Sequence, residues 1–190
     1  MKKISLLIII LIATCTVVLA QPRAIGGRLG WTIGPSYQHQ IGKKNMIQAD
    51  IDFVGFGIWG VQGTVTFNWL IPLVSVNSGN LVLYPGVGVG GGCDWGWGGS
   101  GMIDWLKGSK HPWFTCGFAG VAGMIGLEWN FKFPLQLSVE YRPLIAPQLF
   151  KDARYCLFNN KNIGIDFYYR GLWSSAIAVG VRYKFGGKEQ

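Results

Sequence analysis

The glycine-rich stretch YPGVGVGGGCDWGWGGSG, residues 84–101, contains a spacing that is typical of nucleotide cofactor binding. Gly86, Gly88 and Gly91 form G-x-G-x-x-G, which holds a dinucleotide pyrophosphate where a strand leads into a helix. The residues that follow, CDWGWGGSG, do not favour a helix, because so many glycines carry a high cost in backbone entropy. The spacing therefore does not predict a dinucleotide site, and we expect no cofactor.

The two histidines, His39 and His111, are the other candidates for catalytic residues. His39 has Ser36 three residues away, which the alternation of a strand places on the opposite face. His111 lies near Ser109 and Asp104. Neither set combines a nucleophile, a base and an orienting group in the way that covalent catalysis needs. We therefore predict no catalytic residues and no enzymatic activity.

Cysteines give no framework for a metal or for several disulfides. Three of them follow residue 20, namely Cys93, Cys116 and Cys156. An odd number does not form a complete disulfide set, and their spacing is not that of a zinc site, so no metal is expected. A single bridge from Cys93 to Cys116 would close the segment between them.

The N-terminal segment is typical of a secretory signal peptide. Lys2 and Lys3 precede an apolar run from Ile4 to Ile12, and small or aliphatic residues stand before Gln21. We expect residues 1–20 to be removed and residues 21–190 to form a single domain.

The composition favours a β-barrel in a membrane. The chain holds 29 Gly, 11 Phe, 9 Trp and 7 Tyr, yet no apolar run after residue 20 is long enough for a spanning helix. In lipid, a closed barrel is the structure other than a helix that satisfies its own backbone. The formal net charge of +8, on an exported chain, favours acidic lipid or lipopolysaccharide as the partner and disfavours nucleic acid.

Period-2 alternation predicts eight strands, an even number as a bacterial barrel requires. In the last of them, Ile177, Val179 and Val181 share one face, and Arg182 and Lys184 share the other. The alternation is clearest in residues 47–53, 61–69, 135–142 and 175–185, and weaker in residues 23–31, 33–41, 80–90 and 114–131. The sequence therefore predicts an all-β fold, an eight-stranded antiparallel up-and-down transmembrane β-barrel.

An eight-stranded barrel is narrow enough to be filled by its own side chains. Gly86, Gly88 and Gly90 would share the inner face of the strand over residues 80–90, and would leave room for long side chains from neighbouring strands. The glycines of the opening stretch therefore have a structural explanation.

Connection lengths predict the orientation. One end of the barrel has connections at residues 41–45, 71–79 and 132–134, and the other has long loops near residues 91–113 and 146–174. Bacterial barrels keep short turns in the periplasm and long loops outside. We therefore expect both long loops to be extracellular and both termini to be periplasmic.

The inward faces of the predicted strands carry charges of both signs. The positive set is Arg28, Arg142, Arg182 and Lys184, and the negative set is Asp50, Asp52, Glu128 and Glu140. An unpaired charge in a narrow lumen costs several kcal/mol, so we expect a salt-bridge network that plugs the barrel. The alternative is a small pore for ions or solutes that passes these charges.

The long loop over residues 91–113, GGCDWGWGGSGMIDWLKGSKHPW, is rich in tryptophan. It contains Trp95, Trp97, Trp105 and Trp113. Exposed aromatic side chains between glycines suit contact with a sugar or another surface. The alternative is that they fold onto the barrel mouth or lie in the outer leaflet.

Four segments carry a resemblance to a known family: AIGGRLGW, SYQHQIGKKNMIQADIDF, IGLEWNFKFPLQLSVEYRP and IAVGVRYKF. The chain resembles the small outer-membrane β-barrel proteins of the Bacteroidetes type, which are similar to OmpA- and OmpX-like eight-stranded barrels. The resemblance implies export across the inner membrane and insertion by the barrel-assembly machinery. We predict a monomer that contacts outer-membrane lipids and lipopolysaccharide. From the plugged lumen and the long outer loops we predict a structural or surface-interaction role. Some other eight-stranded outer-membrane proteins modify lipid A, and that enzymatic alternative stays open.

Overall fold

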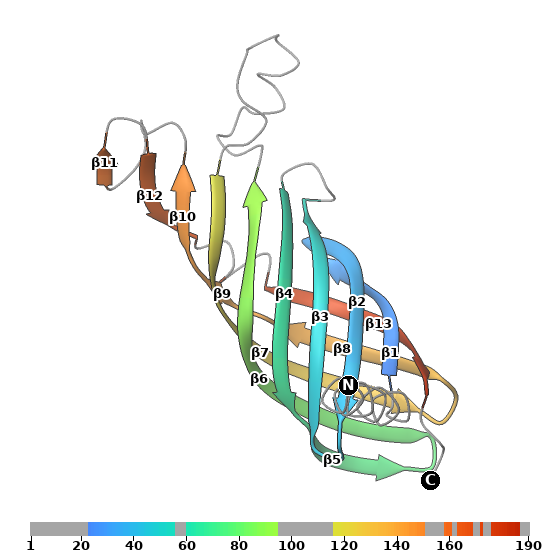
Figure 1. The fold of residues 1–190 in the computed structure, drawn as a ribbon. Helices are drawn as coiled ribbons and strands as arrows, with labels where there is room; N and C mark the ends of the chain where they lie inside the picture. Colours follow the sequence, from blue (N-terminus) through green and yellow to red (C-terminus); the bar gives the residue numbers. More distant parts are fainter. Residues whose placement is uncertain are drawn as a thin grey trace, which may run out of the picture.

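The computed structural model describes residues 23–55, 60–94, 116–150, 158–160, 163–168, 172 and 176–186. Eight antiparallel strands form the body of the fold (Figure 1). They are β1 (Arg23–Gly30), β2 (Thr32–Ile41), β3 (Asn45–Val54), β4 (Gly60–Trp69), β6 (Gly79–Asp94), β7 (Cys116–Phe131), β8 (Leu135–Tyr141) and β13 (Ile177–Phe185).

These eight strands close into a barrel. Each pairs with the next in the order β1, β2, β3, β4, β6, β7, β8 and β13, and β13 pairs with β1. Arg23 at the start of β1 lies opposite Phe185 at the end of β13. The predicted all-β class, strand number and up-and-down order are confirmed. We call the end that holds Arg23 and Phe185 the lower end.

The alternation along each strand separates two faces with opposite chemistry. In β4, the inward side chains of Gln62, Thr64 and Thr66 are buried, and the outward side chains of Val65 and Phe67 are exposed. The barrel therefore has a polar interior and an apolar exterior. A water-soluble protein distributes its side chains the other way round.

Tight turns join the strands at the lower end. Residues 42–44 connect β2 to β3, and residues 132–134 connect β7 to β8. Gly42 has a φ of 65°, which other residues adopt only at a steric cost. These two short connections agree with the predicted ones.

Two predicted connections contain further strands. Residues 71–79 include β5 (Ile71–Val76), which continues the line of β4 past the end of β3 and pairs with β6. The predicted loop over residues 146–174 includes strands that extend the sheet beyond the upper end (Figure 1). They are β10 (Pro147–Phe150), β11 (Phe158–Asn160) and β12 (Ile163–Phe167), and β9 (Leu144–Ile145) precedes them.

The stretch that contains G-x-G-x-x-G lies within β6. Gly86, Gly88 and Gly91 are part of one uninterrupted strand of 16 residues, which is no dinucleotide-binding turn. β6 also continues through Asp94, so the loop predicted to begin at residue 91 starts later. The tryptophans predicted for surface contact, Trp95, Trp97, Trp105 and Trp113, lie outside the described residues.

Candidate functional site: the charged lumen

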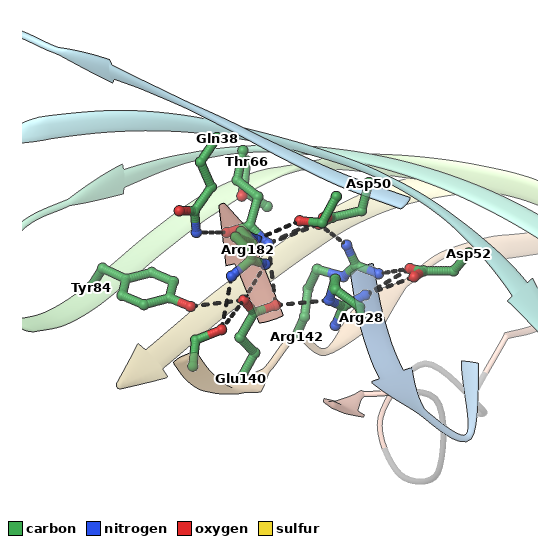
Figure 2. Close-up of polar contacts among 12 residues, drawn as sticks. Arg28, Gln38, Asp50, Asp52, Thr66, Tyr84, Glu140, Arg142 and Arg182 are labelled. Carbon is green, nitrogen blue, oxygen red and sulfur yellow. Dashed lines mark hydrogen bonds and ion pairs between the residues drawn. The ribbon is translucent and has the colours of Figure 1, made fainter. Parts of the chain in front are cut away.

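Six charged side chains meet in the middle of the barrel (Figure 2). Each is at most 3% exposed to solvent. They come from β1, β3, β8 and β13, and from the residue that follows β8. The six are Arg28, Asp50, Asp52, Glu140, Arg142 and Arg182.

Glu140 binds two of the arginines. Its Oε2 accepts a hydrogen bond from Arg28 Nε at 2.7 Å, and its Oε1 pairs with Nη2 of Arg182. The hydroxyl of Tyr84 donates to the same Oε1 at 2.8 Å. Further donors to this carboxylate are Ser138 Oγ at 2.9 Å and Gln48 Nε2 at 3.1 Å. The carboxylate is therefore held on several sides.

Asp52 links Arg28 to the third arginine. Arg28 Nη1 reaches Oδ1 of Asp52 at 3.0 Å and Oδ2 at 2.7 Å. Arg142 pairs through Nη2 with Asp52 and through Nη1 with Asp50. The ion pairs thus form a chain of alternating sign that runs Arg182, Glu140, Arg28, Asp52, Arg142, Asp50.

The alternation of sign explains how these charges can be buried. Removing an ion from water costs several kcal/mol, and the cost is met only when partners of opposite charge and hydrogen bonds surround it. Three cations and three anions in one chain balance each other, and guanidinium groups suit this role because they can donate to two carboxylates at once. We call this charge-balanced set of six side chains the plug.

A glycine on β13 makes room for the guanidinium group of Arg182. Arg28 lies opposite Gly180 on β13 and Gly34 on β2. A Cβ atom at Gly180 would overlap the guanidinium of Arg182 and the hydroxyl of Ser138. The sequence predicts that glycines of β6 leave room for side chains of neighbouring strands, and this is true of some of them. At Gly86 the neighbour is the Asn68 side chain, and at Gly88 it is mainly the backbone of β4.

The structure places the two other predicted lumen charges below this chain. Glu128 accepts hydrogen bonds from the amides of Asn130 and Gln136. Lys184 donates from Nζ to the carbonyl oxygen of Phe131 at 2.7 Å. In the described residues, the ion pairs of the plug therefore join six of the eight predicted charges.

Apolar clusters lie on both sides of the plug. Toward the upper end, the rings of Phe118 and Tyr168 stack with centroids 3.9 Å apart. They pack with Ala122, Leu144 and Ala146. Toward the lower end, Met46 and Met124 pack against Tyr84. Sequence reasoning missed Tyr84 and Tyr168. Tyr84 could have been found, because the alternation over residues 80–90 places its side chain on the inward face of the predicted strand.

Of the two histidines, His39 lies within the described residues. Tyr37 Oη lies 3.5 Å from His39 Nδ1. Ser36 faces the lumen, where its Oγ accepts from Arg182 Nε at 2.9 Å. His39 and Ser36 therefore point to opposite faces, as predicted. The other set, Asp104, Ser109 and His111, lies outside the described residues.

The bridge from Cys93 to Cys116 that the sequence left possible is not formed in the structure. Cys93 is a free cysteine, and the register places Gly117 opposite it. Cys116 instead lies opposite Asp94. Within the described ranges, no group of three or more His, Cys, Asp or Glu side chains is arranged to hold a metal ion.

Comparisons with known proteins give no assignment. The chain matches no protein-family model, and no curated protein is significantly similar to it in sequence. The structure itself defines a closed, eight-stranded antiparallel β-barrel with an ion-paired lumen. In the part of the chain that the structure describes, no helix is long and apolar enough to cross a membrane.

Proposed function

We propose that this chain is a bacterial outer-membrane β-barrel protein with a plugged lumen and a structural or surface-interaction role. The observation that carries the proposal is the apolar belt on the outside of the barrel. Large apolar side chains are exposed on all eight barrel strands. Examples are Ile25, Tyr37, Ile51, Val65, Val89, Val121, Val139 and Val179.

A belt of this kind is unfavourable in water and favourable in lipid. Monomeric soluble proteins rarely expose a contiguous apolar patch of more than a few hundred Å². A lipocalin-like soluble barrel would have its apolar face inside and its charges outside. Here Arg28, Asp52 and Glu140 are inside. The inside-out distribution is that of outer-membrane barrels.

Aromatic side chains near the strand ends also support a place in a bilayer. At the lower end, Trp129 and Phe131 make an edge-to-face contact with centroids 6.3 Å apart, and Phe131 stacks on Phe133. Trp31 and Phe53 are exposed near the upper end. Membrane barrels carry such aromatic girdles at both interfaces.

The ion-pair chain favours a plug and disfavours a pore. A conducting path would have to separate Arg28 from Asp52 and Glu140, which are all at most 1% exposed. Breaking one such buried contact leaves an uncompensated charge. We infer that the activity of the protein lies at its surfaces: outer-membrane lipid and lipopolysaccharide around the belt, and external ligands at the upper loops.

The rest of the proposal follows the orientation expected from the connections. The lower end, with its short turns, would face the periplasm together with both termini, and the barrel-assembly machinery would insert the chain as a monomer. Cell fractionation, with protease added to intact cells, tests this arrangement. Cleavage confined to the upper loops is expected. Recovery of the protein in a soluble fraction would contradict the proposal.

Conductance across a planar bilayer tests the plug. The chain is refolded in detergent, and a heat-dependent shift in gel migration shows that the barrel has formed. Silence is expected for the folded wild type. Discrete current steps that change when Arg142 is replaced by alanine would show that the charges line a path, and would replace the plugged barrel with a pore.

A further inference from the structure

The lower end of the barrel carries a hairpin whose outer face continues the apolar belt (Figure 1). It consists of β5 and the start of β6, which the turn at Asn77 and Ser78 joins. Ile71 on β5 lies opposite Leu83 on β6, and Leu83 lies opposite Leu127 on β7. Ile71 and Leu127 are both exposed. The apolar surface that we propose to face lipid therefore extends onto β5.

β5 differs from the barrel strands because it is paired on one side. Among the described strands it pairs with β6 alone. An unpaired strand edge is unfavourable in hydrocarbon, where no water satisfies its backbone groups. Pro72 lowers the number of unmet donors on this strand, because it has no backbone N–H. The edge of β5 therefore belongs at the polar interface of a bilayer. Its exposed side chains Ile71, Val74 and Val76, which we call the β5 face, lie where that interface meets the hydrocarbon.

An exposed lysine lies beside each end of β5. Leu70, which precedes β5, donates from its amide to the carbonyl oxygen of Lys44 at 2.7 Å. Lys132 donates from its amide to the carbonyl oxygen of Ser78, in the turn after β5, at 3.4 Å. Lys44 belongs to the turn between β2 and β3, and Lys132 to the turn between β7 and β8. Backbone contacts therefore fix both lysines next to the hairpin.

No carboxylate among the described residues offsets these two charges at the surface of the lower end. Three of the described carboxylates belong to the plug, and Asp94 and Asp166 lie on strands of the upper end. Glu128 is 5% exposed and accepts hydrogen bonds from the amides of Asn130 and Gln136. The exposed turns beside β5 are therefore complementary to an anion.

Exposed aromatic side chains accompany both lysines. Trp69 ends β4 and pairs with the residue that follows Lys44. Phe133 follows Lys132 and stacks on Phe131 with centroids 4.9 Å apart. Aromatic rings favour the interface of a bilayer, and a lysine there keeps its apolar stem on apolar surface while its ammonium group reaches the headgroups. The combination favours lipid over an acidic protein as the partner.

We propose that the β5 face, with the lysines beside it, binds an anionic phospholipid of the leaflet at the lower end. The phosphate lies at Lys44 or Lys132, and an acyl chain lies along Ile71, Val74 and Val76. This inference rests on the proposed function, because it requires the barrel to lie in a bilayer. It adds the class of lipid and the surface that selects it.

Native mass spectrometry of the refolded protein in a non-ionic detergent tests the surface. The protein is mixed with equal amounts of phosphatidylglycerol and phosphatidylcholine that have the same acyl chains and differ in net charge. More phosphatidylglycerol than phosphatidylcholine is expected to stay bound. Equal binding by a barrel that also enters phospholipid vesicles would overturn this inference and leave the proposed function standing. Failure of the folded barrel to enter vesicles would overturn both.

Lys43 provides a matched control, because it belongs to the same turn as Lys44 but lines the mouth of the lumen. Lys44→Gln and Lys132→Gln should each lower the ratio of bound phosphatidylglycerol to phosphatidylcholine about fivefold. Lys43→Gln should leave the ratio unchanged. Lys44→Arg and Lys132→Arg should keep the wild-type ratio, because the charge is kept. Equal losses in Lys43→Gln and Lys44→Gln would show that the attraction is only that of a basic surface, and would overturn the site.

Val74→Ser and Val76→Ser test the apolar half of the surface. Each should lower the binding of both lipids about threefold, because apolar area that covers an acyl chain is lost. The ratio of the two lipids should stay at the wild-type value, since the lysines select the headgroup. Unchanged binding of both lipids would show that no acyl chain lies on β5, and would overturn the proposal.

Discussion

At the scale of single residues, Glu140 has the most consequential set of contacts in the lumen. It is the carboxylate that joins Arg182 to the rest of the ion-pair chain. Arg28 keeps Asp52 when Glu140 is lost. For Arg182, the remaining described side-chain partners are the hydroxyls of Ser36 and Ser138.

We therefore expect Glu140→Ala to destabilise the barrel by about 3–5 kcal/mol, the usual cost of leaving a buried charge without its partner. Urea unfolding of the refolded protein, followed by tryptophan fluorescence, measures the change. Glu128→Gln is the control, because the partners of Glu128 are amides and one acceptor oxygen remains. An equal loss of stability in the two variants would contradict the special place of Glu140.

Sequence reasoning could select these residues but could not pair them. The alternation along each strand puts Arg28, Asp52 and Glu140 on the inward face, and this was sufficient to place them in the lumen. Which arginine meets which carboxylate depends on the stagger of strands that are far apart in the chain: Arg28 and Glu140 are separated by 112 positions. For the same reason the sequence could not show that Glu128 and Lys184 lie below the six ion-paired side chains.

At the scale of elements, the β6–β7 pair is stabilised by a tyrosine that covers a glycine. Tyr84 lies directly opposite Gly126 in the register. A Cβ atom at Gly126 would overlap the Tyr84 ring, and the ring also places its hydroxyl on Glu140. An aromatic side chain that covers a cross-strand glycine is a known way to fix the register of a sheet.

Gly126→Ala should therefore cost about 1–3 kcal/mol, because the tyrosine must leave its position in a filled core. Gly63→Ala is the matched control. Gly63 also lies in a barrel strand, but a Cβ atom there meets nothing within 4 Å. Chemical denaturation of both variants gives the comparison. Loss of stability in Gly63→Ala as large as in Gly126→Ala would mean that any side chain in these strands is unfavourable, whatever its neighbours.

The eight barrel strands were predictable because each has one polar and one apolar face. β5 was missed because Ile71, Leu73, Val74 and Val76 leave no alternation to detect. The signal that was available is the pair of β-rich segments on either side of Asn77 and Ser78, which is the pattern of a hairpin. The strands β10 to β12 were missed because they have only 4, 3 and 5 residues, which is too short for an alternating pattern to stand out.

Closure of the sheet should make the barrel strands more stable than the strands attached to it. β3 and β4 have paired neighbours on both sides, whereas β11 pairs only with β12 among the described strands. Hydrogen–deuterium exchange of the refolded protein should show slow exchange in β3 and β4 and faster exchange in β11, since a strand paired on one side opens locally at lower cost. Uniform protection across all of them would contradict this order.

At the scale of the whole molecule, the question is which solvent surrounds the apolar belt. Val89 lies in the interior of β6, five residues before its upper end, opposite Val65 and Val121 on the adjacent strands. Tyr183 lies near the end of β13 at the lower end of the barrel. Their exposed fractions are similar, 62% and 58%. In water, an arginine at either position would be surrounded by the same solvent and would have a similar, small effect.

In a bilayer the two positions differ in depth, and the variants Val89→Arg and Tyr183→Arg separate the two environments. Arginine on the lipid face of a barrel costs about 2–4 kcal/mol at the midplane and about 0–1 kcal/mol near an interface. We therefore expect Val89→Arg to lose several times more stability than Tyr183→Arg when both are refolded into phospholipid vesicles. Urea unfolding from the vesicles measures both. Equal and small losses would mean that the belt does not lie in lipid, because depth would then have no influence on the cost of the charge.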